Sequence, residues 1–159
     1  MNGSASKALW FVFTGAVYIM AVLGIYVLKS IGHTDNIIAD SVRKGNAYYS
    51  VQLYDKAVDC YLKALNYEPD NQGIVNGLVK VLLVQAKEQE DYENAVNIYE
   101  QVLELDPDNR TAYWGIADIF DKMGDYSRMS NVLEKGYENT LDGSMREKMS
   151  SLNMLKSQE

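Results

Sequence analysis

The chain has 159 residues and carries 22 acidic against 15 basic side chains, which gives a net charge of −7. Nucleic-acid binding needs a basic face that neutralises phosphates, so this balance argues against a nucleic-acid partner. The lone cysteine, Cys60, excludes an internal disulfide.

An uncharged apolar run occupies residues 8–28, between Lys7 and Lys29. A helix of these 21 residues covers about 31 Å, close to the roughly 30 Å hydrocarbon thickness of a bilayer. Aromatic rings near both ends suit the two membrane interfaces. The sequence therefore predicts a polar tail at 1–7 and a single transmembrane helix at 8–29. A buried core helix and a cleaved signal peptide are the alternatives.

The stretch after the apolar run is predicted to be a linker at 30–37. Gly32, His33 and Asp35 interrupt the apolar pattern there. A new helix is expected to start near Thr34 to Asp40, because these residues include capping types. The linker would hold the following domain close to the bilayer.

A repeated pattern follows the linker. Seven positions have the spacing of a 34-residue helix-turn-helix unit: Gly45, Tyr48, Tyr54, Ala57, Tyr61, Ala64 and Pro69. The last part of the unit recurs 38 residues later at four positions: Tyr92, Ala95, Tyr99 and Pro107. A third, divergent copy keeps four positions: Ala117, Phe120, Gly124 and Tyr126. The pattern resembles the tetratricopeptide repeat (TPR) family. That resemblance implies an all-α solenoid over 38–141, with units at about 38–71, 72–109 and 110–141.

Each unit should hold a front and a back helix, which in the first unit are expected at about 40–52 and 54–66. Pro69 and Pro107 end the first two units, since proline cannot continue a helix. The second unit is four residues longer near 87–91, about one helical turn, which predicts a longer front helix. The acidic residues there are more typical of a solvated helix end than of a calcium loop.

A last amphipathic helix is predicted within 142–159. Four apolar side chains share one side of it: Met145, Met149, Leu152 and Leu155. In the TPR family such a helix covers the open end of the solenoid. A methionine-rich surface for a partner is the alternative.

The sequence predicts a protein that is not an enzyme. His33 is the only histidine, and it stands outside the repeats, so neither a zinc site nor a histidine-based relay can be assembled. A glycine-rich phosphate loop is also missing from the sequence. We therefore expect no catalytic residue, no metal, no cofactor and no small-molecule substrate.

The resemblance to TPR proteins implies a binding groove along the front helices. Its expected lining residues come three from each unit: Val42, Asn46, Tyr49, Asn76, Lys80, Leu83, Trp114, Asp118 and Asp121. They combine apolar, aromatic, amide and charged groups, which suits a protein or peptide partner. Trp114 is expected to be the main anchor. A ring half-buried against the neighbouring repeat is the alternative for Trp114.

One known TPR specialisation is disfavoured. Repeats that capture the C-terminal carboxylate of heat-shock chaperones use two lysines, two asparagines and an arginine at fixed positions. Only Asn46 is kept, and Val42, Gly77, Thr111 and Gly115 occupy the other four positions. Without these cationic donors a carboxylate clamp is not expected.

The layout predicts a single-pass membrane protein that displays a TPR protein-interaction scaffold. It is similar to that of bacterial inner-membrane factors with an N-terminal anchor, associated with protein translocation or envelope assembly. The alternative is a structural subunit of a homo-oligomeric or fixed membrane complex. Lys29, Arg43 and Lys44 follow the anchor and Lys7 alone precedes it, which favours a cytoplasmic domain.

Overall fold

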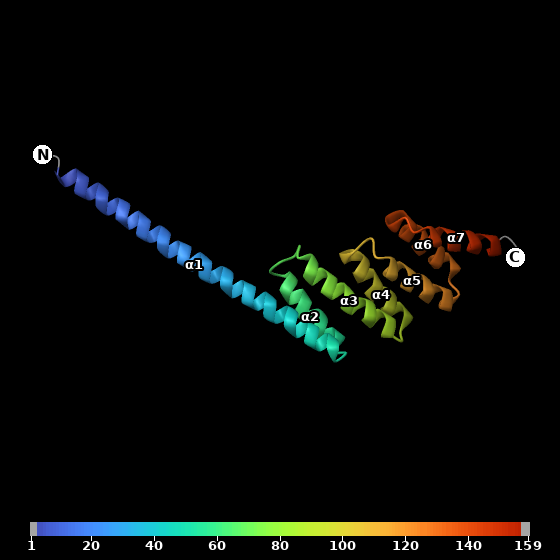
Figure 1. The fold of residues 1–159 in the computed structure, drawn as a ribbon. Coiled ribbons are helices and arrows are strands. Elements are labelled where there is room, and N and C mark those ends of the chain that lie inside the picture. Colours follow the sequence, from blue (N-terminus) through green and yellow to red (C-terminus); the bar gives the residue numbers. More distant parts are fainter. Residues whose placement is uncertain (1–2, 157–159) are drawn as a thin grey trace.

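The computed structural model describes the backbone of residues 3–156 and the side chains of residues 18–29 and 32–154. Within this range the chain is all α-helical, without a strand. The helices are α1 (Gly3–Ser50), α2 (Tyr54–Leu65), α3 (Gln72–Glu88), α4 (Tyr92–Leu105), α5 (Arg110–Met123), α6 (Tyr126–Thr140) and α7 (Gly143–Lys156). Figure 1 shows α1 extending far beyond a stack formed by the other helices.

Helix α1 runs for 48 residues without a break. Residues 30–37 lie inside it, so the predicted interruption at Gly32 and the predicted helix start near Thr34 to Asp40 are wrong. A single glycine costs a helix only about 1 kcal/mol, and no proline stands nearby to block the backbone hydrogen bonds. Asn36 Nδ2 even donates to the Gly32 carbonyl at 2.8 Å, one turn earlier in the same helix. The apolar segment and the first front helix are therefore one rod.

Successive helices pair along the chain from α1 to α7, so each helix packs on the next. The front helices are residues 38–50 of α1, then α3 and α5, and the back helices are α2, α4 and α6. The expected lengthening of the second front helix is confirmed, since α3 has 17 residues and α5 has 14.

The turns between units owe their shape to a short sequence pattern. Asn71 caps α3 by accepting from the Gly73 and Ile74 backbone N–H groups at 3.0 and 3.3 Å. Asn109 caps α5 in the same way through the Ala112 N–H at 3.1 Å. A carboxylate three residues before each asparagine accepts from its amide: Glu68 from Asn71 and Asp106 from Asn109. Both turns thus satisfy the backbone donors that begin the next helix.

The repeat-signature residues form the core between helices, as predicted. Ala57 and Ala64 are fully buried, and Tyr61 is 4% exposed. Small side chains let two helices approach closely, and the tyrosine ring then fills the space beside them.

Helix α7 packs on α6 and covers the end of the stack, as predicted. Met145 and Leu152 are buried and Met149 is half-buried, whereas the side chain of Leu155 lies outside those described. The Met145 sulfur sits against Gly136 of α6, where an added Cβ would lie 2.7 Å from it.

Across the residues that the structure describes, no helix includes a segment with the length and apolarity to cross a membrane. The side chains of residues 8–17, the first half of the predicted transmembrane helix, lie outside the described ones.

Candidate functional site

The front helices lie on the inner side of the stack. Among the described residues the backbone of α1 approaches that of α3, and α3 approaches α5, whereas α2, α4 and α6 stay further apart from one another. Closer spacing on one side curves a stack of helix pairs toward that side. The surface of α1, α3 and α5 is therefore the concave one.

The nine predicted groove residues all lie at the surface. Five are exposed: Asn46, Asn76, Lys80, Asp118 and Asp121. Four are half-buried: Val42, Tyr49, Leu83 and Trp114. Seven of them fall into three groups, at the start, middle and end of the front surface, whereas Leu83 packs against the core and Asn76 lies exposed on α3. Their role in binding stays a prediction.

The first group lines an open hollow of about 630 Å³ between α1 and α3. Eight residues line it: Ile38, Ala39, Val42, Arg43, Asn46, Asn71, Gly73 and Ile74. Apolar side chains form most of this wall, and Arg43 is its only charged residue. We call this space the α1–α3 hollow.

Sequence reasoning found only Val42 and Asn46 among the residues of the α1–α3 hollow. Ile38, Arg43 and Ile74 were missed because the family pattern assigns groove roles to fixed positions alone. Helical spacing offered a signal, since Ile38 and Val42 lie one turn apart on α1.

Beside the hollow, the ring of Tyr61 lies between Gly45 and Gly77. An added Cβ would lie 3.0 Å from the Tyr61 ring at Gly45 and 2.6 Å from it at Gly77. The Tyr61 hydroxyl donates to Asn46 Oδ1 at 2.7 Å. Burial, then the nearby Cys60 and Tyr49, raises the pKa of Tyr61, which keeps the hydroxyl protonated. This bond orients the Asn46 amide at the edge of the hollow.

The second group, Tyr49 and Lys80, lies further along α1 and α3 than the residues that line the hollow. Lys80 Nζ stands 4.8 Å from the centre of the Tyr49 ring, a cation–π contact. The Tyr49 and Tyr54 rings are 6.2 Å apart, and the Tyr54 hydroxyl donates to Glu88 at 3.0 Å. A cation on an aromatic platform thus continues the front surface from the hollow.

The third group lies on α5 and is engaged with neighbouring side chains. Asp118 pairs with Lys122 at 2.7 Å, and Asp121 pairs with Lys148 of α7 at 3.8 Å. The half-buried Trp114 packs against the core. Hydrogen bonds from Ser144, and a further one from the Trp114 side chain, lower the pKa of Asp142. Trp114 is therefore tied to the α6–α7 turn as well as facing the surface.

The structure explains the glycines at two positions of the chaperone clamp. A Cβ at Gly77 would collide with the Tyr61 ring, and a Cβ at Gly115 would collide with the Tyr99 ring. No longer side chain fits at either position while the rings keep their places.

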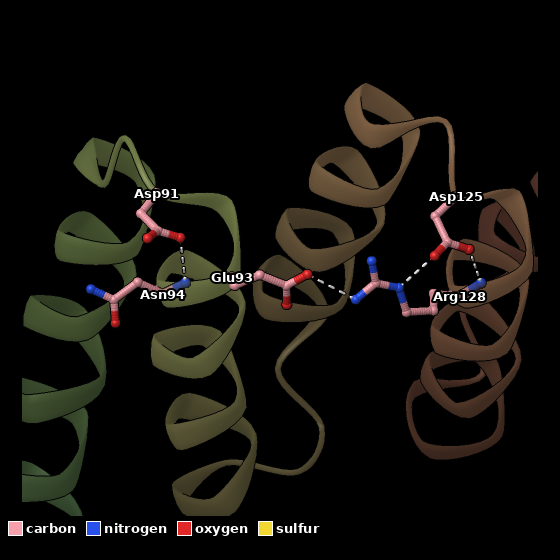
Figure 2. Close-up of polar contacts among 5 residues, drawn as sticks. All are labelled: Asp91, Glu93, Asn94, Asp125 and Arg128. Atoms are coloured by element: carbon pink, nitrogen blue, oxygen red, sulfur yellow. Dashed lines mark hydrogen bonds and ion pairs between the residues drawn. The ribbon is translucent and has the colours of Figure 1, made fainter.

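The acidic residues near the start of α4 serve the fold, as Figure 2 shows. Asp91 caps α4 by accepting from the Asn94 N–H at 3.1 Å. Glu93 pairs with Arg128 of α6 at 3.1 Å, and Arg128 also contacts Asp125 at 2.6 Å. These long side chains bridge the back helices, which lie further apart than the front ones.

Comparisons with known proteins agree on the fold. A model described as "TPR repeat" matches residues 87–124, and one described as "Tetratricopeptide repeat" matches residues 42–71. No protein with curated annotation matches the sequence. The chain is thus an all-α helical solenoid that carries TPR repeats in these two segments.

Several solved structures are similar to the chain. The Hsp90 co-chaperone Cns1 from Saccharomyces cerevisiae is 16% identical, with a TM-score of 0.51 over 79% of this chain and 41% of that one. The N-terminal domain of stress-induced protein-1 from C. elegans is 24% identical, with a TM-score of 0.49 over 76% and 96%. The Sgt2 TPR domain from Aspergillus fumigatus is 22% identical, with a TM-score of 0.41 over 79% and 80%. At these identities the likeness concerns the fold.

Proposed function

We propose that this protein is a membrane-tethered scaffold that binds a segment of a partner polypeptide along its front helices. The observation that carries the proposal is the α1–α3 hollow, an open apolar space with one cation on a chain of net charge −7. TPR solenoids commonly use their concave side to bind other proteins.

The proposed partner segment differs chemically from a chaperone tail that is bound through its C-terminal carboxylate. Such capture needs several converging cations. The tyrosine rings beside Gly77 and Gly115 leave no room for the clamp's asparagine at the first of these positions or for its arginine at the second. The likeness to the Hsp90 co-chaperone Cns1 concerns the fold and leaves this argument unchanged.

Membrane attachment through α1 is part of the proposal. Its support is the exposure of large apolar side chains around the helix between Tyr18 and Leu28, from 47% at Val22 to 74% at Tyr26. A helix that is apolar all round needs an apolar environment on every side. The excess of cations after the run supports a cytoplasmic domain, and the layout fits protein translocation or envelope assembly.

Site-specific photo-crosslinking tests this function in intact membranes. A photoreactive residue at Ala39, in the hollow, should capture a polypeptide, and one at the exposed Lys63 of α2 should not. Equal capture at both positions would contradict a groove. Capture of a second copy of the chain at Ala39 would favour the alternative of a homo-oligomeric structural subunit.

A further inference from the structure

We propose that the partner is itself a membrane-spanning protein beside the anchor, and that the segment in the α1–α3 hollow is the part of its chain next to the bilayer. This inference rests on the proposed function, because it requires α1 to hold the protein in a membrane. It adds where the partner's segment comes from and what chemistry it carries.

Helix α1 is continuous from the apolar run to the hollow. The exposed apolar residues 18–28 and the hollow residues Ile38 and Val42 belong to one uninterrupted helix. Gly32 and its neighbours form a helical rod where the sequence pattern indicated a linker. A continuous helix, and not a flexible linker, therefore holds the hollow at a fixed height above the bilayer.

The hollow lies a short distance beyond the end of the apolar run. The apolar run ends at Leu28, and the α1 residues that line the hollow lie between Ile38 and Asn46. At a rise of 1.5 Å per residue, Ile38 lies about 15 Å beyond Leu28 along the helix, and Val42 lies about 21 Å beyond it. An extended chain advances about 3.3 Å per residue, so a partner that leaves the bilayer beside the anchor reaches the hollow within about seven residues.

The hollow also faces the same way as one side of the apolar segment. Gly24 and Val42 are 18 residues apart, which is about five full turns, so both lie on the same side of α1. An added Cβ at Gly24 meets nothing within 4 Å, so this side of the apolar segment is uncovered. A rigid helix thus aims the hollow at whatever lies on the Gly24 side of the anchor.

Charge defines the chemistry of the expected segment. The hollow has an aliphatic wall and Arg43, without a carboxylate among its lining residues. Asp40 is shared between Arg43 at 2.6 Å and Lys44 at 2.7 Å, so this cluster keeps one net positive charge. Lys80 on Tyr49 extends the cationic surface. An apolar side chain followed by acidic ones complements this surface.

The same end of the stack disfavours lipid as the occupant. Helix α2 runs back toward the anchor, so the α2–α3 turn faces the bilayer and carries Glu68 and Asp70. The α4–α5 turn lies at the same end of the stack and carries Asp106 and Asp108 (Figure 1). These carboxylates repel the anionic surface of a cytoplasmic leaflet. A protein segment with its own acidic groups reaches Arg43 without bringing these turns against lipid.

Insertions in α1 test the inference with the full-length chain in its native membrane. Two alanines inserted after Gly32 turn the stack by about 200° and raise it by about 3 Å. Four alanines turn it by only about 40° and raise it by about 6 Å. The readout is the yield of photo-crosslinking at Ala39, with Lys63 as the control position and the membrane content of each chain measured in parallel.

We expect the two-residue insertion to lower the crosslinking yield by about tenfold or more, and the four-residue insertion to retain most of it. The crosslinked peptide, identified by mass spectrometry, should come from an integral membrane protein, within about ten residues of its span.

Equal yields from both insertions, or a captured soluble protein, would overturn this inference and leave the proposed function standing. Capture of lipid or of a second copy at Ala39 would also overturn it. A yield at Ala39 no higher than at Lys63 in the unaltered chain would overturn both proposals.

Discussion

At the scale of single residues, one packing contact recurs in this fold: a tyrosine of a back helix packs against a glycine of a front helix. Tyr61 lies against Gly77, and 38 residues later Tyr99 lies against Gly115. Burial raises the pKa of Tyr99, as it does that of Tyr61. The rings fill the space between units, and the glycines leave room for the rings.

Replacing Tyr61 should destabilise the stack strongly. Tyr61→Ala removes a ring that is 4% exposed and leaves a cavity that costs about 3 to 5 kcal/mol. Tyr61→Phe keeps the ring and loses the bond to Asn46, so it should cost about 0.5 to 1.5 kcal/mol. Urea unfolding of residues 30–159, followed by circular dichroism, measures both. Equal losses for the two variants would mean that the hydroxyl, and not the ring, stabilises the unit.

Adding one methyl group at Gly77 should also destabilise. The new Cβ would lie 2.6 Å from the Tyr61 ring, and the resulting strain costs about 1 to 3 kcal/mol, partly offset by about 1 kcal/mol of helix propensity. Gly143→Ala is the matched control, because an added Cβ there meets nothing within 4 Å. If Gly77→Ala melts at or above the temperature of Gly143→Ala, the contact with the ring is not tight.

At the scale of helices, polar contacts decide how neighbouring elements start and join. Asp125 caps α6 by accepting from the Arg128 N–H at 2.9 Å and also binds the Arg128 guanidinium (Figure 2). Arg128 lies 4.5 Å from the centre of the Phe120 ring of α5 and pairs with Glu93 of α4. One arginine of α6 therefore connects the back helix α4 and the front helix α5 to its own helix.

The contribution of the Asp125 charge should depend on pH. Hydrogen bonds from the Arg128 backbone and side chain lower the pKa of Asp125 below its ordinary value of 3.8. A lowered pKa in the folded state stabilises above the pKa of the unfolded chain, and this contribution is lost as the pH falls through the folded value. Asp125→Asn keeps a capping oxygen but not the charge.

Thermal melting of the unaltered chain and of Asp125→Asn should therefore differ at pH 7, and the difference should shrink as the pH falls below 3.8. A difference that stays the same size through this fall would assign the effect to capping geometry alone. Asp125→Ala, which removes cap and charge together, should remain less stable throughout.

At the scale of the whole molecule, α1 belongs to two parts of different character. Its apolar segment extends beyond the stack, and its last turns form the first front helix of the acidic stack. Every large apolar side chain described between Tyr18 and Leu28 is exposed, whereas the buried core lies beyond residue 40. The two parts therefore have opposite requirements for their surroundings, and α1 joins them rigidly.

Removing residues 1–29 should separate these requirements. Residues 30–159 should remain helical and in solution, because the deleted part contains the exposed apolar run and the acidic remainder disfavours an anionic membrane surface. Flotation with membranes after a salt wash, beside circular dichroism, measures both properties. If the shortened chain still floats with membranes, a second attachment exists outside α1.

The sequence by itself determined the repeated units and their buried positions. Packing residues such as Ala57 and Tyr61 recur at fixed helical spacing, because a helix has one period and each unit buries the same face. Local chemistry also predicted the turns, where Pro69 follows the end of α2 and Asn71 caps α3. These features depend on residues close together in the chain, so pattern reasoning reached them.

Only the tertiary structure decided how distant residues meet. The hollow needs Ile38 and Ile74 side by side, and the back-helix bridge needs Glu93 beside Arg128. Such distances depend on how whole helices stack, which no local spacing records. The continuity of α1 through Gly32 was decided in the same way: helical segments on both sides outweigh the small local cost of one glycine.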